Sequence, residues 1–441
     1  MNYILLLYLF FISVNTFRSD HGAAEKAVDK KEASIAIKRA SIPLAEWRYH
    51  ETYSFVRHDL DTISHANGLS LFYEKLYELK SGQRKRVSIV QIGDSHIQPD
   101  LISREVRIGL QRFFGDAGRG LVFPYQVART NGPQDIRSSA PTRWLSSTIS
   151  QLRSSASRGI SGFTLSRHNG AGNFQLYLKP DIESGQQSFD YIRLFVGQGA
   201  WQLDPIHASG LSYPITASSA DTAFRLKEIQ LSEPSTGFTM HALTHQSYFF
   251  GASLEKQHAP GVLFHTIGVN GARYAQYNES EMFWKQLPSL QADLYILSMG
   301  TNESLYNTMT TDLYIHDVAE TIAKIKAIDP DAAILITTMA ESFKGGKRNV
   351  MMEKLNRALS QYCARLNIPL WDLFGITGGA GSSSYWLKSN LLQADKIHYQ
   401  RKAYIMQGAL LFDAIAHDYN AFVEQKAENP SAHRLAKIED K

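Results

Sequence analysis

Ser95 stands where an α/β enzyme could present a nucleophile. The apolar run at residues 87–92 is followed at once by Gly-Asp-Ser-His at 93–96. A serine where a strand meets a sharp turn can expose its hydroxyl at the edge of a sheet, and a neighbouring glycine permits that turn. The alternative is an ordinary turn in which Ser95 caps the following helix. If Ser95 is a nucleophile, the chemistry that it predicts is acyl transfer.

A nucleophilic serine needs a base to take its proton, and the base needs a carboxylate to orient it. Asp395 and His398 are the candidate pair, because their Asp-x-x-His spacing lets the carboxylate reach the imidazole within one loop. The spacing alone is weak evidence, since Asp204 and His207 repeat it among turn residues of a β-rich stretch. We interpret that second pair as part of a surface loop.

Acyl transfer also needs hydrogen-bond donors for the oxyanion that forms on the carbonyl oxygen. The N–H of Ser95 can supply one, and the side-chain amide of Asn302, which follows another apolar run, can supply a second. The N–H of Gly271 is the third candidate, because glycine exposes its N–H without side-chain obstruction. Gly268 competes for that role, and a plain tight turn at 268–271 is equally compatible with the sequence.

These residues must be positioned by the elements that precede them. Strand-like and helix-like patterns alternate, and such alternation predicts a parallel sheet covered on both faces, with catalytic groups at the carboxyl ends of its strands. The predicted strands are 87–92, 262–267, 294–298, 333–338 and 368–373. The predicted helices are 101–114, 312–328, 349–366 and 400–419, and residues 41–82 also look mainly helical.

The middle of the chain has a different pattern of apolar and turn-forming residues. Residues 122–260 show short alternating apolar segments between Gly, Ser, Asn and Pro clusters, which is typical of an antiparallel β-sandwich. We interpret it as an insertion into one α/β domain, whose two parts are residues 41–121 and 261–425. A chain of 441 residues is long enough for this organisation. Residues 426–441 are predicted to be a C-terminal tail.

The N-terminus resembles a targeting segment. Residues 3–14 form an apolar run of signal-peptide length that is too short to span a bilayer comfortably. We therefore predict a signal peptide at 1–17, a disordered polar tail at 18–40, and export to the periplasm or beyond the cell. No Lys or Arg precedes the run, so an uncleaved membrane anchor is the alternative.

Composition argues against one functional class and excludes two kinds of cysteine site. The chain is 44% hydrophobic and 20% charged with a net charge of +4, and its Lys and Arg residues are scattered, which gives little support to nucleic-acid binding. Cys363 is the only cysteine, so the chain can form no internal disulfide and no cysteine-based zinc site. The helix-like pattern around Cys363 suggests a buried small hydrophobe.

The chain resembles the SGNH (GDSL-type) esterase/lipase superfamily over residues 87–115 and 261–418. The resemblance is carried by four blocks in the same order: Gly93-Asp94-Ser95-His96, a glycine in 268–271, Gly300-Thr301-Asn302-Glu303 and Asp395-Lys396-Ile397-His398. It implies a three-layer α/β/α, flavodoxin-like hydrolase domain with a parallel sheet and the inserted antiparallel β-sandwich. One departure is Glu303, where the family usually has Asp after the asparagine.

The resemblance also implies the role of each residue. Ser95 would be the nucleophile, His398 the base and Asp395 its orienter, while Ser95, Gly271 and Asn302 would bind the oxyanion. Members of the family typically need no metal and no organic cofactor. His96 would either line the acyl pocket or stabilise the turn, and we favour the structural role.

Within the superfamily, His96 and the large insertion resemble peptidoglycan O-acetylesterases, whose inserted sandwich is similar to carbohydrate-binding modules. This implies removal of an acetyl ester from a muramic-acid sugar through an acetyl-serine intermediate, by a monomer whose partner is an acetylated glycan and not a nucleic acid. The alternatives are another ester (a polysaccharide acetate, a lysophospholipid or a thioester) or a catalytically silent glycan-binding protein. Trp201 and Trp386 could stack on a sugar, though core packing explains them as well.

Overall fold

The computed structural model describes residues 41–42, 53–151, 157–168, 170–180, 187–206, 210–216 and 224–428. The predicted signal peptide at 1–17, the tail at 18–40 and residues 429–441 lie outside the described residues. No helix in the described ranges is long and apolar enough to cross a membrane. The chain divides into two compact units, residues 44–418 and residues 1–43 together with 419–441. Within the smaller unit, the amide group of Asn420 exchanges two hydrogen bonds with the backbone of Ile42.

The larger unit contains a six-stranded sheet that carries the predicted strands. Its order is β1-β19-β16-β15-β2-β14, and all neighbours are parallel except β1 and β19. The strands are β1 (Ile63–Ser64), β19 (Leu370–Trp371), β16 (Ala333–Thr337), β15 (Leu294–Ser298), β2 (Arg86–Gly93) and β14 (Gly261–Gly268). Nearly every residue of β2, β14, β15 and β16 is buried, as expected for a parallel sheet covered on both faces.

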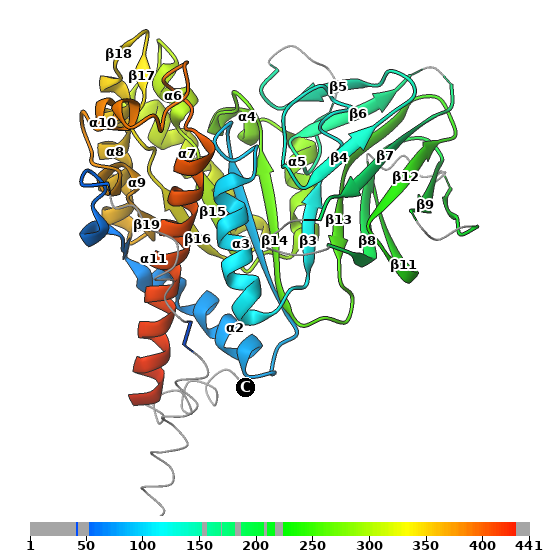
Figure 1. Ribbon diagram of the computed structural model, residues 1–441, viewed down its shortest axis with the longest axis horizontal. Coiled ribbons are helices and arrows are strands. Elements are labelled where there is room, and N and C mark those ends of the chain that lie inside the picture. Colours follow the sequence, from blue (N-terminus) through cyan, green and yellow to red (C-terminus); the bar gives the residue numbers. More distant parts are fainter. Residues whose placement is uncertain are drawn as a thin grey trace, which may run out of the picture. The chain divides into compact units, whose positions relative to one another are not determined.

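Helices of the larger unit cover the two faces of this sheet. On one face, α3 packs against β14 (Figure 1). Gly109 of α3 leaves room for the ring of Phe412 in α11. On the other face, α7 and α8 bury apolar side chains in the same core as Val90 and Leu297. The helices are α2 (Ser70–Lys80), α3 (Leu101–Phe114), α4 (Tyr274–Asn278), α5 (Glu281–Gln286), α6 (Thr301–Leu305), α7 (Thr311–Ile328), α8 (Val350–Leu366), α9 (Leu373–Ile376), α10 (Ser383–Lys388) and α11 (Arg401–Glu428).

The segment before β2 is less helical than its pattern predicts. In its described part, from residue 53 onward, α2 is preceded by the short strand β1 and by the 3-10 turns His58–Leu60 and Ala66–Leu69. Strand β1 adds an antiparallel edge by pairing Ile63 with Trp371. The predicted helical pattern is confirmed over Ser70–Lys80 and is wrong around Ile63–Ser64, because pairing with a distant strand overrides a local pattern there.

The β-rich middle of the chain folds into two antiparallel sheets. Their orders are β10-β9-β12-β7-β4 and β11-β8-β13-β6-β5, and β3 also pairs with β13. The first five strands to appear are β3 (Gly118–Val122), β4 (Ile136–Ser139), β5 (Leu145–Thr148), β6 (Phe163–Arg167) and β7 (Gly172–Leu178). The others are β8 (Phe189–Val196), β9 (Trp201–Pro205), β10 (Tyr213–Ile215), β11 (Arg225–Ser235), β12 (Gly237–Ala242) and β13 (Ser247–Glu255).

An aromatic core joins the two antiparallel sheets. The ring of Phe249, on β13, lies 5.0 Å from that of Phe174, on β7, and 6.3 Å from that of Trp201, on β9. Trp201 also stacks on Trp144 and is completely buried. Trp386 is equally buried in the α/β part, so both tryptophans serve in core packing and neither is available to a sugar.

Candidate active site

The structure brings Ser95, His398 and Asp395 together. Nε2 of His398 lies 2.8 Å from Oγ of Ser95, and Nδ1 of His398 lies 2.7 Å from Oδ2 of Asp395. An ionised carboxylate can only accept hydrogen bonds, so Nδ1 carries the proton and Nε2 accepts from the serine hydroxyl. The three side chains thus form one hydrogen-bonded chain with the tautomer that a general base requires.

The loop at 395–398 holds its own carboxylate. Oδ1 of Asp395 accepts hydrogen bonds of 2.9 Å from the N–H groups of Ile397 and His398, which leaves Oδ2 for the imidazole. Lys396 takes a left-handed conformation, with φ of 59°, that closes this turn. Partial burial acts to raise the pKa of Asp395, but the hydrogen bonds from His398 and from the loop backbone outweigh it, and the pKa is lowered. Asp395 therefore stays ionised near neutral pH.

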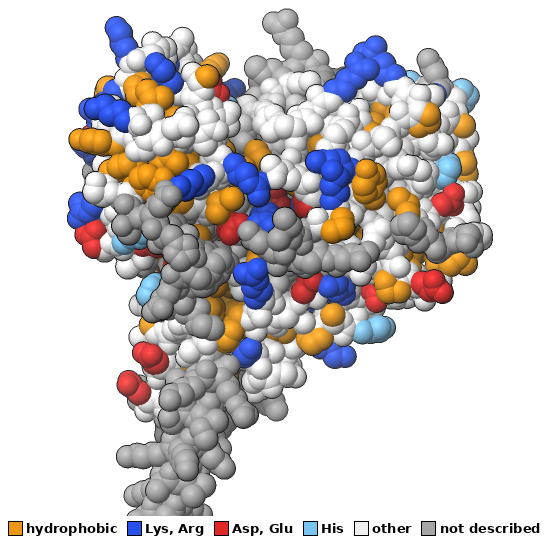
Figure 2. All heavy atoms as spheres, in the orientation of Figure 1, with side chains coloured by type: hydrophobic (Ala, Val, Ile, Leu, Met, Phe, Trp, Pro, Cys, Tyr) orange, Lys and Arg blue, Asp and Glu red, His pale blue; other side chains and the backbone are white. Residues whose placement is uncertain are grey.

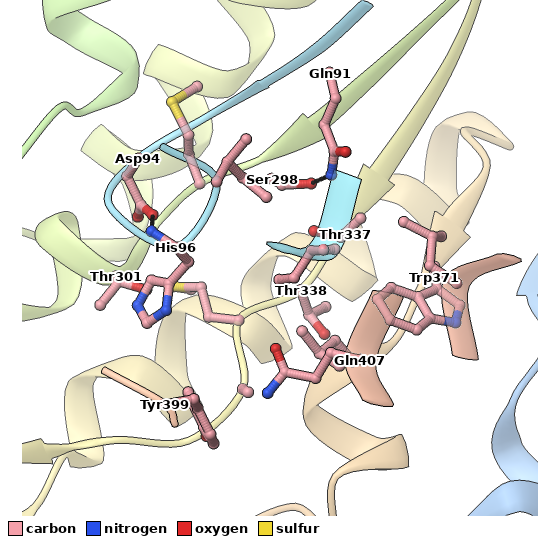
Figure 3. A pocket seen from close by; sticks show the side chains of 17 residues that line it. Gln91, Asp94, His96, Ser298, Thr301, Thr337, Thr338, Trp371, Tyr399 and Gln407 are labelled. Atoms are coloured by element: carbon pink, nitrogen blue, oxygen red, sulfur yellow. Dashed lines mark hydrogen bonds between the residues drawn. The ribbon is translucent and has the colours of Figure 1, made fainter. Parts of the chain in front are cut away.

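The turn that presents Ser95 leaves the sheet at the end of β2. A Cβ at Gly93 would lie 2.2 Å from the Ile97 side chain and 2.8 Å from the Ser298 carbonyl oxygen, so only glycine fits there. Oδ1 of Asp94 accepts a 2.9 Å hydrogen bond from the N–H of His96, which closes the turn (Figure 3). Burial raises the pKa of Asp94 to about 6.

His96 contacts the base as well as stabilising the turn. Its ring centroid lies 5.2 Å from that of His398, and its Nδ1 lies 2.9 Å from the hydroxyl of Tyr404 in α11. Burial, followed by the nearby charge of His398, lowers the pKa of His96 to about 3, so its ring stays neutral. Tyr404 was missed by the sequence reasoning, because it belongs to no motif and resembles any other apolar position of the closing helix.

The glycine and the asparagine proposed for the oxyanion lie beside each other. Asn302, in the first turn of α6, donates a 3.0 Å hydrogen bond from Nδ2 to the carbonyl oxygen of Ala272. Gly271 has a φ of 77°, and a Cβ there would meet nothing closer than 3.7 Å. A Cβ at Gly268 would instead lie 2.2 Å from the backbone N of Gln98. Gly268 is therefore required for close packing, and the geometry favours Gly271 as the glycine with an accessible turn.

The turn at 269–272 is tied to the nucleophile turn. The N–H of Val269 donates to the carbonyl oxygen of Gly93 at 3.3 Å, and the hydroxyl of Tyr277 donates to the same oxygen at 2.9 Å. Strands β2 and β14 end in register, with Gly93 opposite Gly268. The three polar blocks thus meet at one edge of the sheet.

A small cavity lies behind the nucleophile turn. It has a volume of about 40 Å³, and its lining includes Gln91, Asp94, His96, Thr338 and Gln407 (Figure 3). A water molecule needs about 10–15 Å³ measured in this way, so the cavity has room for a few small solvent molecules. Neither Ser95 nor His398 lines it, so the cavity does not lie directly beside the reacting hydroxyl and imidazole.

Charged side chains form no strong pattern on the face that Figure 2 shows. In the view of Figure 2, Lys and Arg side chains are spread singly over the visible face and do not gather into a stripe. In the described ranges, no group of three or more His, Cys, Asp or Glu side chains is arranged to hold a metal ion.

Comparison with known proteins places this geometry in context. Residues 237–404 match the GDSL-like Lipase/Acylhydrolase family model. A solved structure described as "Peptidoglycan O-acetylesterase in action" is similar over 81% of this chain and 99% of its own, with a TM-score of 0.68 and 22% sequence identity. A lipase/acylhydrolase from Enterococcus faecalis is 18% identical and covers 36% of this chain and 77% of its own, with a TM-score of 0.28. No curated protein sequence matches the chain.

Proposed function

We propose that this chain, an esterase with a GDSL-like acylhydrolase domain at residues 237–404, removes O-acetyl groups from a cell-wall glycan, with peptidoglycan as the substrate. The observation that carries the proposal is the hydrogen-bonded chain from Asp395 through His398 to Ser95. This arrangement can deprotonate a serine hydroxyl at the moment when it attacks an ester.

The first half-reaction transfers the acetyl group to the enzyme. Oγ of Ser95 attacks the ester carbonyl carbon while Nε2 of His398 takes the hydroxyl proton. The carbonyl oxygen becomes an oxyanion, for which the N–H of Ser95, the N–H of Gly271 and the amide of Asn302 are the proposed donors. The tetrahedral intermediate then collapses, His398 gives its proton to the departing sugar oxygen, and acetyl-Ser95 remains.

The second half-reaction returns the enzyme to its starting state. His398 takes a proton from a water molecule, whose oxygen attacks the acetyl-serine carbonyl carbon. Collapse of this second intermediate breaks the bond to Oγ of Ser95, which recovers its proton from His398, and acetate leaves. The sum is one ester and one water converted into a sugar hydroxyl and acetic acid. Asp395 stabilises the imidazolium that forms in each half-reaction.

Three observations support the glycan substrate. His96, the neighbour of the serine, and the large insertion resemble peptidoglycan O-acetylesterases. The fold is shared with a protein described by that name, and the match covers 81% of this chain, which is more than the two α/β parts alone. We propose that the insertion at 122–260 contacts the glycan. Export through the signal peptide at 1–17, to the periplasm or beyond, is part of the same proposal.

The test is acetate release from defined substrates. Purified protein is incubated with O-acetylated peptidoglycan, with acetylated xylan and with a long-chain ester, and acetate or fatty acid is quantified. We expect the highest kcat/KM on peptidoglycan. A preference for xylan acetate or for the long-chain ester would replace the substrate without changing the mechanism.

The nucleophile is tested with Ser95→Ala. We expect kcat on a chromogenic acetate ester to fall by at least about a thousandfold, because the variant lacks the hydroxyl that forms the acyl intermediate. The thermal unfolding midpoint should stay close to that of the wild type, which serves as the folding control. Hydrolysis retained by the variant would show that Ser95 is not the nucleophile.

A further inference from the structure

Two consecutive residues of α6 hold the turn that follows Gly271. Asn302 donates to the carbonyl oxygen of Ala272 at 3.0 Å, and Oε1 of Glu303 accepts a 2.8 Å hydrogen bond from the N–H of Tyr274. The two hydrogen bonds hold the backbone at Ala272 and Tyr274, on either side of residue 273. They therefore hold the backbone directly after Gly271 against the first turn of α6.

Glu303 makes this contact from inside the protein. Its exposed fraction is 0%, and its second oxygen, Oε2, has no hydrogen-bond partner among the described residues. The hydroxyl groups of Tyr274 and Tyr314 beside it are also buried, and no described residue bonds them. The titratable groups that act on Glu303 or on these two tyrosines are Asp94 of the nucleophile turn, Arg273, and Cys363 of α8.

The surroundings of Glu303 keep its carboxyl group uncharged. Burial raises the pKa of Glu303 to about 8, against the opposing hydrogen bond from the Tyr274 N–H, and the negative charge of Asp94 adds to the rise. An uncharged carboxyl can still accept the Tyr274 N–H through Oε1. It also places no negative charge next to the site where the oxyanion develops, where low dielectric would make such a charge unfavourable.

We propose that Glu303 is a positioning residue, which holds the turn after Gly271 in register with Asn302 so that both can bind the oxyanion. The proposal rests on the proposed esterase mechanism. Glu303 touches neither the substrate nor the reacting atoms, and it acts through the backbone of Tyr274. Its uncharged form is the active one, because ionisation adds a buried negative charge behind the oxyanion donors.

Two substitutions separate the hydrogen bond from the charge. Glu303→Gln keeps an acceptor for the Tyr274 N–H and cannot ionise, so kcat on a chromogenic acetate ester at pH 7 should stay within about threefold of the wild type. Glu303→Met keeps the volume and removes the acceptor. A misplaced oxyanion donor lowers turnover more than binding, so we expect kcat to fall about tenfold or more with KM within about twofold.

The pH profile supplies a readout that a merely structural role would not move. The kcat of the wild type should fall as pH rises above about 8, where Glu303 loses its proton, and Glu303→Gln should lack this alkaline decline. The matched control is Asp61→Asn. Burial also raises the pKa of Asp61, to about 7, but this carboxyl bonds the indole N–H of Trp371 on β19 and not the oxyanion turn. The control should keep the wild-type alkaline decline.

The outcomes distinguish this inference from the proposed function. Hydrolysis by the wild type, its loss in Ser95→Ala and the expected behaviour of the Glu303 variants support both. The esterase mechanism stands if the wild type is active and Ser95→Ala is not. The positioning role is then overturned if Glu303→Met has the kcat of the wild type, or if Glu303→Gln keeps the alkaline decline. The thermal unfolding midpoint of Glu303→Met is also measured, because this variant could fold poorly. If that midpoint is strongly lowered, the kcat of Glu303→Met is set aside, and the pH profile of Glu303→Gln alone tests the positioning role.

Discussion

Solvent reaches one end of the hydrogen-bonded chain at the proposed active site. The Asp395 side chain is 46% exposed. On the other side of His398, the ring of His96 packs against that imidazole and bonds the hydroxyl of Tyr404 in α11. Water can therefore compete for the carboxylate, and the two backbone N–H groups that bind its Oδ1 are what keep it oriented. The orientation of the base depends on this local loop geometry as much as on burial.

The role of this carboxylate is tested with Asp395→Asn. An amide in this position can donate its N–H to Nδ1 of His398 and so favours the tautomer in which Nε2 cannot accept the serine proton. We expect kcat to fall by about 10²- to 10⁴-fold with a smaller change in KM, measured with a chromogenic acetate ester. Retention of more than a tenth of the wild-type kcat would contradict the assignment.

The contact between Tyr404 and His96 gives a second prediction at this scale. Tyr404→Phe removes the hydroxyl from Nδ1 of His96, so the ring that packs on His398 loses its anchor. We expect kcat to fall by about three- to tenfold, with about 1–2 kcal/mol lost from the free energy of unfolding. Tyr295→Phe is the matched control, since its buried hydroxyl bonds Asp329 away from the site. That variant should lose stability without losing kcat, and equal losses of kcat in the two variants would refute a specific role for Tyr404.

At the scale of elements, the ends of two strands decide where the polar blocks meet. Strands β2 and β14 run in parallel and end together, with Gly93 opposite Gly268. Each strand ends in a glycine, and a side chain at either glycine would collide with the turn that follows β2. The N-terminus of α6 then approaches from the β15 side and bonds the second turn through Asn302 and Glu303.

Two glycine substitutions test this arrangement. In Gly268→Ala the new Cβ would lie 2.2 Å from the backbone N of Gln98, so we expect the free energy of unfolding to fall by about 2 kcal/mol or more. In Gly271→Ala there is space for Cβ, and the left-handed φ costs only about 1–2 kcal/mol, but the altered turn should lower kcat. Chemical denaturation and kcat are measured for both. If Gly268→Ala impaired kcat without loss of stability, the two glycines would have to exchange roles.

At the scale of the whole larger unit, buried ion pairs tie the β-rich segment to the α/β part. Asp100, which precedes α3, accepts hydrogen bonds from Arg107 of α3, from Arg119 of β3 and from Thr266 of β14. Arg119 also bonds Asp135, just before β4. Burial opposes the ionisation of Asp100, but Arg107 and Arg119 outweigh it and lower its pKa to about 2.

Removing the shared arginine tests this connection. Arg119→Met leaves Asp100 and Asp135 buried with less compensation, so we expect a loss of about 3–5 kcal/mol in the free energy of unfolding at pH 7. Arg193→Met is the matched control, because its ion pair with Glu228 is partly exposed and should contribute less than about 1 kcal/mol. Urea unfolding should show a clearly larger loss of unfolding free energy in Arg119→Met than in Arg193→Met.

The same ion pairs predict how stability depends on pH. A carboxyl whose folded pKa lies below its unfolded value of about 3.9 stabilises the fold above that value, and the contribution disappears as pH falls toward about 2. The stability gap between the wild type and Arg119→Met should therefore narrow between pH 5 and pH 2. A gap that is unchanged over this range would exclude Asp100 as its source.

The sequence by itself determined the features that local patterns encode. The alternation of strands and helices predicted the parallel sheet, because apolar periodicity follows directly from which faces an element buries. The Asp-x-x-His spacing made Asp395 and His398 a candidate pair, because their contact needs only one short loop, and the order of the four blocks favoured them over Asp204 and His207. Ser95 became a candidate nucleophile because a strand pattern ends immediately before it.

Tertiary structure decided what depends on contacts between distant segments. Ser95 and His398 are 303 residues apart in sequence, and only the shared sheet edge brings them to 2.8 Å. The backbone of Gln98, which leaves no room for a side chain at Gly268, could not be foreseen from the sequence, and the contacts of Glu303 and Tyr404 required partners on other elements. Such contacts leave no periodic signal in a single sequence, because the fold can meet the same packing and hydrogen-bonding need with many residue pairs.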